Sequence, residues 1–130
     1  MYLEKGDYIP FLKFNSFDIH LYCNEKYYLI ICVNDINTFN SQINYLNNIR
    51  KFFNLIIIYK EGIFNKFNIS SNDSKLHKIF EIKDDKITII IANPNKKIIS
   101  INFINELNVF NYNEFLCNKP LNNNIPYLEV

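Results

Sequence analysis

The sequence predicts an α/β fold in which helices flank a central mixed sheet. Three short runs of β-branched apolar residues carry this prediction, together with one intervening segment whose apolar residues recur every three or four positions. The 130 residues fit one domain, and the 48 % hydrophobic share provides enough apolar surface for a core. We expect the domain to span residues 1–118. Residues 119–130 contain two prolines and three consecutive asparagines, so we expect a linker or tail there.

The first half of the chain predicts a β-α-β unit after an N-terminal extended segment. Residues 27–33 are continuously apolar, which is typical of a strand buried on both faces, and Asn34 and Asp35 are expected to end it. Residues 36–53 follow the helical period, with Asp35 or Asn37 as the cap. A short connection of this kind makes the next strand parallel to the first.

That next strand is predicted at residues 55–59. Residues 62–67 are expected to form one or two helical turns. A turn at residues 71–74 offers caps for a short helix over residues 75–80, whose apolar side chains can face the core.

The second half predicts a β-hairpin followed by a helix. Residues 87–92 are a third strongly apolar strand, and the tight turn at residues 93–96 leads into a strand over residues 97–104. A short final helix is expected at residues 112–118. The complete order is β-α-β-α-β-β-α, which is the order of the thioredoxin fold.

Composition excludes several classes of function. The formal net charge of +1 provides no electrostatic reason to bind nucleic acid or an acidic membrane. With only two glycines, Gly6 and Gly62, the chain cannot form a glycine-rich phosphate loop. The start of the chain lacks an apolar signal core, and three scattered cysteines form no metal spacing, so we expect a reducing, cytoplasmic location without metal or cofactor.

Four short segments resemble one protein family. Residues 3–11 (LEKGDYIPF) contain a Gly-Asp followed by Pro and an aromatic, and residues 34–41 (NDINTFNS) match the spacing of a Pro-x-x-x-Thr-x-x-Cys motif. Residues 71–82 resemble a Ser-Asp turn and helix, and residues 93–98 (NPNKKI) resemble an Asp-Pro-x-Gly-Lys-Ile hairpin. Their order and spacing over residues 3–101 resemble the alkyl hydroperoxide reductase and thiol-specific antioxidant group of peroxiredoxins.

The resemblance places Ser41 where that family has its peroxidatic cysteine. Asn34 replaces the motif proline and only Thr38 is retained. The active-site arginine that the family has before the third strand is missing: Lys86 is the nearest cation, off register by about one residue, and Arg50 does not match. Thr38, Ser41 and Lys86 would thus form a vestigial site.

The chemistry of such a site requires a thiolate. A helix N-terminus and a nearby arginine lower the thiol pKa, and the attacking sulfur becomes a sulfenic acid that a second thiol removes. A serine hydroxyl is barely ionised at neutral pH and has no such state. We therefore expect a degenerate domain with little or no peroxidase activity, serving as a scaffold or interaction module.

The resemblance and the residues leave three functions open. A scaffold would pair with a second copy or stand beside an Fe(II)/2-oxoglutarate oxygenase domain. A working thiol oxidoreductase would use a relocated cysteine, Cys23 or Cys117, since Cys32 lies inside the first strand and is expected to be inert. A small-molecule-binding domain would use the pocket around Thr38 and Ser41.

Other polar residues predict no site of their own. His20 and His77 are remote from Ser41 in sequence, so a hydrolase triad is disfavoured, and both are expected at the surface. Asp84 and Asp85 fall in a charged turn and are expected to be solvated. Asp35 follows a buried strand as a phosphoacceptor does, but the chain lacks the early acidic pair that a receiver domain needs.

Overall fold

The structure is a computed structural model that describes residues 3–10, 13–14, 17–18, 25–37, 43–63, 70–71, 74–80, 82–107 and 110–112. Its elements are β1 (Lys13–Phe14), β2 (Phe17–Asp18), β3 (Tyr28–Asp35), α1 (Ile43–Ile49), β4 (Asn54–Glu61), β5 (Ser70–Ser71), α2 (Ser74–His77), β6 (Ile87–Ala92) and β7 (Ile98–Ile104).

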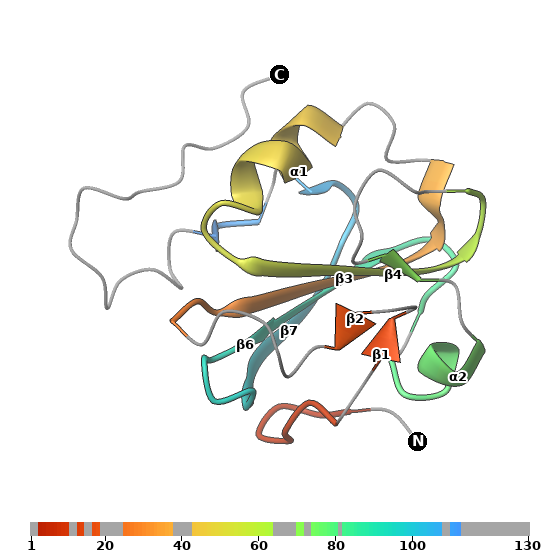
Figure 1. The fold of residues 1–130 in the computed structure, drawn as a ribbon. Helices are drawn as coiled ribbons and strands as arrows, with labels where there is room; N and C mark the ends of the chain where they lie inside the picture. The colour runs from red at the N-terminus through yellow and green to blue at the C-terminus, as the bar shows by residue number, and fades with distance from the viewer. Residues whose placement is uncertain are drawn as a thin grey trace.

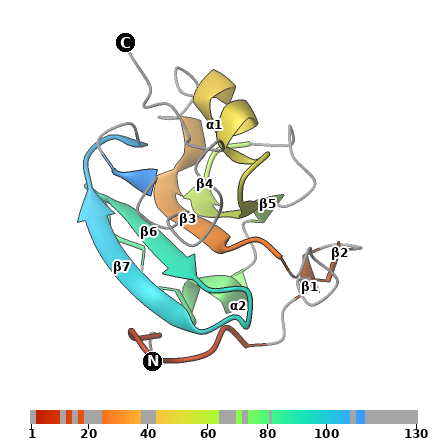
Figure 2. The same ribbon diagram turned by 90° about the vertical axis from the view of Figure 1, so that its left-hand side faces the viewer.

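Four long strands and the two-residue β5 form one mixed sheet in the order β5-β4-β3-β6-β7 (Figure 2). β3 runs parallel to β4, as a β-α-β unit requires, and antiparallel to β6. β6 and β7 form an antiparallel hairpin with a register shift between Ile91 and Ala92. The α/β class, the parallel pair and the hairpin are thus confirmed. The separate pairing of β1 with β2 has no counterpart in the sequence-based prediction.

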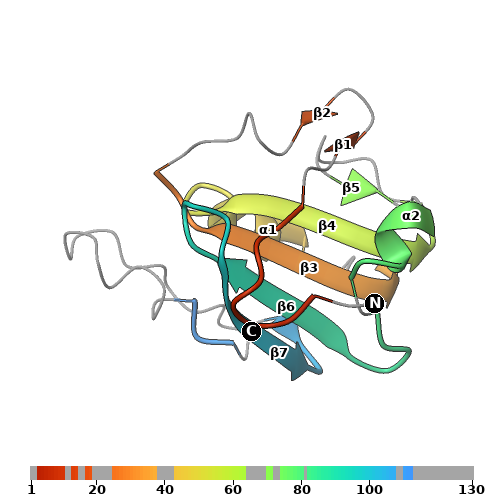
Figure 3. The ribbon, with the colours of Figure 1, turned by 90° about the horizontal axis from the view of Figure 1, so that it is seen from below.

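The strands are continuously apolar because elements cover both faces of the sheet. α1 lies over the upper face in Figure 1, while α2 and the N-terminal segment lie below it, as Figure 3 also shows. The lower core consists of Ile9, Tyr28, Ile30, Cys32, Ile56, Ile58, Leu76, Phe80, Ile90, Ala92 and Ile98.

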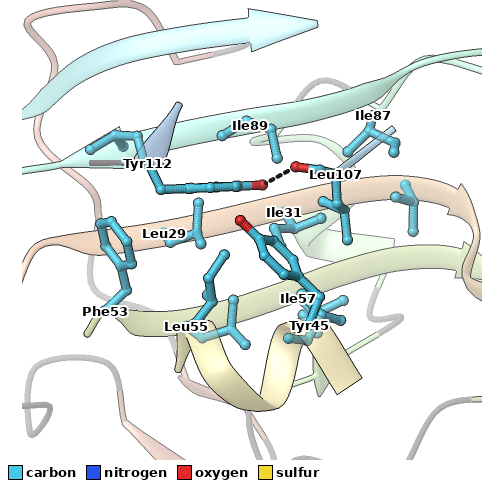
Figure 4. Close-up of a cluster of buried hydrophobic side chains, with 14 of the residues drawn as sticks. Leu29, Ile31, Tyr45, Phe53, Leu55, Ile57, Ile87, Ile89, Leu107 and Tyr112 are labelled. Carbon is cyan, nitrogen blue, oxygen red and sulfur yellow. Dashed lines mark hydrogen bonds between the residues drawn. The ribbon is translucent and has the colours of Figure 1, made fainter. Parts of the chain in front are cut away.

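The upper core is built around aromatic rings from distant parts of the chain. Tyr45 on α1, Phe53 before β4 and Tyr112 near the end of the described chain converge over β3 (Figure 4). The Tyr112 hydroxyl donates a hydrogen bond of 2.8 Å to the carbonyl oxygen of Leu107. Residues that follow the last strand therefore close this face of the sheet.

The predicted end of the first long strand, β3, is wrong. Asn34 and Asp35 belong to the strand, because the parallel ladder with β4 continues until Asp35 lies opposite Glu61. Ile36 and Asn37 then form a 3₁₀ turn, and the α-helix is described from Ile43, while residues 38–42 lie outside the described residues.

Later boundaries also differ. The second helix is shorter than predicted, spanning Ser74–His77, and Ser71 lies in an edge strand rather than in a turn. The remaining turn at residues 64–67, the final helix beyond Tyr112 and the tail at residues 119–130 lie outside the described residues.

The N-terminal segment attaches to the β6–β7 turn. Gly6 N–H donates to the Ile98 carbonyl at 2.8 Å, and Ile98 N–H donates to the Asp7 carbonyl at 2.8 Å. Ile9 N–H donates to the Lys96 carbonyl at 2.8 Å, and the Ile9 side chain is buried. Residues 3–10 thus cover the lower core and add a short antiparallel bridge beside the start of β7.

Candidate functional site

The described residues that come directly before Thr38 lie at the carboxyl ends of the parallel strands β3 and β4. Asp35 and Glu61 are register partners there, and Asp35 Oδ1 accepts a hydrogen bond of 3.0 Å from Asn37 N–H. This Asx-type contact turns the chain out of the strand. Asp35 is one of the two caps predicted from the sequence, and it caps the 3₁₀ turn at Ile36 and Asn37, while residues 38–42, between this turn and α1, lie outside the described residues.

Gly62 packs directly against that turn. A Cβ atom at Gly62 would lie 2.7 Å from Ile36 Cγ2 and 3.1 Å from Asp35 Oδ1. Its φ of +93° is also in the region that favours glycine. Sequence reasoning used Gly62 only to exclude phosphate loops. The change from strand to turn just before Gly62 could have suggested that another part of the chain approaches its backbone closely.

Lys86 lies at the same edge of the sheet, just before β6, which pairs with β3 on the side away from β4. Thr88 lies opposite Cys32 in the antiparallel ladder, so extending that register by two residues brings Lys86 level with Asn34. The Lys86 ammonium donates a hydrogen bond of 2.8 Å to Asn105 Oδ1. Its described partner therefore belongs to the segment after β7 and not to the end of β3.

Several predicted site residues lie outside the described part of the chain. These are Thr38 and Ser41 of the vestigial site, the alternative thiols Cys23 and Cys117, and His20. By register Lys86 is level with the end of β3, and a common site of Lys86 with Thr38 and Ser41 stays a prediction.

Cys32 is fully buried in the lower core, as expected for an inert thiol. Burial raises the pKa of the thiol far above its usual value of 9.0, so it stays protonated at neutral pH. A protonated thiol is neither a nucleophile nor a metal ligand. Cys32 therefore cannot serve as a reactive thiol in this fold.

The buried thiol has a consequence at alkaline pH. The pKa of Cys32 is raised in the folded state. The contribution of the thiol to the free energy of unfolding is therefore complete below the unfolded-state pKa of about 9.0, and it is lost progressively as the pH rises above that value. Between pH 8 and pH 10 we expect ionisation of this thiol in the unfolded state to lower the free energy of unfolding by about 1.4 kcal/mol. Urea titrations of the wild type and Cys32→Ala should show this extra loss in the wild type only. Equal losses in the two proteins would contradict it.

Thr88 is a buried polar residue that sequence reasoning missed. It lies opposite Cys32 and is 1 % exposed, and within the described chain its Oγ1 has no hydrogen-bond partner. The signal in the sequence was a hydroxyl-bearing residue within a run of isoleucines. This signal could not show whether a hydrogen-bond partner reaches the hydroxyl.

His77 is not the surface residue that was expected. It is half-buried on α2, and its Nε2 lies 2.8 Å from the Tyr59 carbonyl oxygen, so this nitrogen donates to the backbone of β4. This hydrogen bond of His77 therefore joins α2 to the sheet. Asp84 and Asp85 are exposed in a bend, as expected.

Over the residues that the structure describes, no three His, Cys, Asp or Glu side chains gather where they could hold a metal ion. No helix in the described part of the chain is long and apolar enough to cross a membrane. The described strand ends offer carboxylates, an amine and backbone groups but no activated nucleophile. Comparisons with protein families, curated proteins and solved structures find no match to this chain.

Proposed function

We propose that the chain is a peroxiredoxin-like domain with a thioredoxin-like fold that lacks peroxidase activity and serves as an interaction module. The strand arrangement supports the fold. Within one sheet, β3 lies between its parallel partner β4 and β6, and β6 forms an antiparallel hairpin with β7. This arrangement agrees with the β-α-β-α-β-β order. The proposed location is the cytoplasm, with a second copy or an adjacent oxygenase domain as partner.

The conformation of Lys96 carries the family part of the proposal. Lys96 stands where the family's Asp-Pro-x-Gly-Lys-Ile hairpin has glycine, and its φ is +72°, a conformation that glycine adopts without steric cost. Non-glycine residues seldom have a positive φ, so the backbone here follows the family pattern although the side chain does not.

Two segments that carry the resemblance also meet in space. The Gly6-Asp7 opening is hydrogen-bonded to Ile98 at the end of the Asn-Pro hairpin, although more than eighty residues separate them. The resemblance was assigned to each segment separately, so their contact is independent support for it.

The side chains support the loss of catalysis. Ser41 cannot form a thiolate, Lys86 is hydrogen-bonded to Asn105, and Cys32 is buried and protonated. The alternative function is a thiol oxidoreductase that uses Cys23 or Cys117.

Thiol-dependent peroxide consumption tests the proposal on the purified full chain. We expect no turnover of hydrogen peroxide or an organic hydroperoxide above the buffer rate with dithiothreitol as reductant. We expect the same of Ser41→Cys, because no arginine is matched to lower its thiol pKa. Robust wild-type turnover would overturn the proposal. Its loss in Cys23→Ser or Cys117→Ser, with a sulfenic acid trapped on that residue, would establish the alternative.

A further inference from the structure

A row of polar residues crosses the sheet at the carboxyl ends of β3 and β4, the end beside α2 in Figure 3. The parallel register that sets Asp35 opposite Glu61 also sets Asn34 opposite Lys60. On the other side of β3, Asn34 is level with Lys86 in the extended antiparallel register. Neighbouring strands lie about 4.8 Å apart, so roughly 10 Å separates the backbones of the two lysines, with Asn34 between them.

The row continues to the segment after β7. Ile87 lies opposite Ile104, so Lys86 is level with Asn105, and the Lys86 ammonium donates to Asn105 Oδ1 at 2.8 Å. This bond uses the amide oxygen of Asn105 and one of the three N–H donors of the ammonium. In the described chain, the Asn105 Nδ2 group and two N–H groups of the ammonium remain as donors for a ligand.

The two lysines and Asn34 lie on the lower face of the sheet. Side chains alternate between the faces along a strand, and Cys32 and Ile58 belong to the lower core. Asn34 and Lys60 follow them by two residues and therefore share that face. Lys86 shares it as well, because it is level with Asn34 across the antiparallel ladder. Lys60 is exposed, and Asn34 and Lys86 are half-buried, so a ligand can reach the row from solvent.

The carboxylates near this row do not neutralise its lysines. By the same alternation, Asp35 and Glu61 lie on the upper face, across the sheet from the lysines. Asp84 and Asp85 are exposed in the bend before β6. Within the described chain, no carboxylate forms an ion pair with either lysine of the row. The row therefore presents positive charge on the lower face only.

Two further groups lie one step inside the row on the same face. Thr88 follows Lys86 by two residues, and its buried Oγ1 has no hydrogen-bond partner in the described chain. Phe103 lies opposite Thr88, and the Lys83 ammonium lies 4.7 Å from the centroid of its ring. A third cation and a hydroxyl donor thus stand beside the two lysines.

We propose that the row of Lys60, Asn34, Lys86 and Asn105 binds a phosphate dianion, either free or as the monoester of a small molecule. Two ammonium groups match the two charges of the dianion, and the amides supply N–H donors to its other oxygens. A carboxylate would leave one ammonium without a counter-charge. Open α/β sheets bind ligands outside the carboxyl ends of their strands, which is where this row lies. The inference goes beyond the proposed interaction role and holds with or without peroxidase activity.

Titration of the full chain with inorganic phosphate, followed by ¹H–¹⁵N NMR, tests the site. The ionic strength is held constant, and the pH is about 8, where phosphate and its monoesters are dianions. We expect saturable shifts of the amide signals of Asn34, Lys60 and Lys86. Lys60→Gln and Lys86→Gln should each weaken binding about fivefold or more, because each removes one charge-assisted contact.

Lys97→Gln is the matched control for the two lysine variants. Lys97 is exposed at the opposite end of the sheet, so this variant removes the same charge without touching the row. It should leave the dissociation constant unchanged within about twofold, because exposed charges beyond a Debye length are screened. Circular dichroism would verify that all three variants are folded. Shifts that do not saturate, or equal weakening in all three variants, would overturn the proposal.

Two further titrations distinguish the ligands. Phenyl phosphate carries the same dianion on an apolar group, so tighter binding than inorganic phosphate would identify a monoester, and weaker binding would identify the free ion. Both results support a phosphate site. Acetate carries one charge and should bind more weakly than either. If acetate bound most tightly, the assignment of the row to a dianion would be wrong.

Discussion

Replacing Tyr112 by alanine is expected to lower the free energy of unfolding by about 4 kcal/mol, the range measured for truncating a buried aromatic residue. Tyr112 is 2 % exposed in the upper core. Its ring centroid lies 4.9 Å from that of Phe110 and 6.2 Å from that of Phe53, both in edge-to-face geometry. Alanine would remove these contacts and leave a cavity above β3. Urea unfolding of the full chain measures the loss.

Tyr112→Phe is the matched control for this truncation. It keeps the ring and removes only the hydroxyl that donates to the Leu107 carbonyl at 2.8 Å. We expect a loss of about 1 kcal/mol, which is typical of one hydrogen bond. If the alanine variant lost no more than the phenylalanine variant, Tyr112 would not be part of the core.

Gly62→Ala is expected to destabilise the fold by about 3 kcal/mol, from overpacking and from an unfavourable backbone conformation together. The new Cβ would lie 2.7 Å from Ile36 Cγ2 and 3.2 Å from Asn37 Cγ. Ile36 cannot move away freely, because its side chain is buried. Chemical denaturation provides the measurement.

Gly6→Ala separates the two causes. Gly6 has a φ of +98°, close to the +93° of Gly62, but a Cβ there would meet nothing within 4 Å. It should therefore cost only the backbone part, about 1 kcal/mol. Equal losses at the two glycines would show that the contact with Ile36 contributes nothing.

The strands were predictable because their signal is local. Residues 87–92 match β6 at both ends, and the runs at residues 27–33 and 55–59 identify β3 and β4. Continuous apolar runs indicate burial on both faces whatever the partners are. The ends of β3 and β4 were missed because polar residues such as Asp35 stay in a strand when a neighbouring ladder continues past them.

The candidate site was less predictable. Motif spacing led to Lys86, which by register is level with Asn34, whereas the placement of Thr38 and Ser41 stays a prediction. It could not predict that Lys86 bonds to Asn105, nor that His77 bonds to the backbone at Tyr59. A side chain's partner depends on which distant segment reaches it, and such contacts leave no periodic pattern in one sequence.

The sequence by itself determined the α/β class, the buried strands and the β6–β7 hairpin. Only the tertiary structure decided that Tyr112 closes the upper core, that Gly6 and Asp7 bond to Ile98, and that β7 is the last strand of the described sheet. Strand propensity and hairpin turns act between near neighbours. Core closure and edge exposure depend on how segments far apart in the chain share the two faces of one sheet.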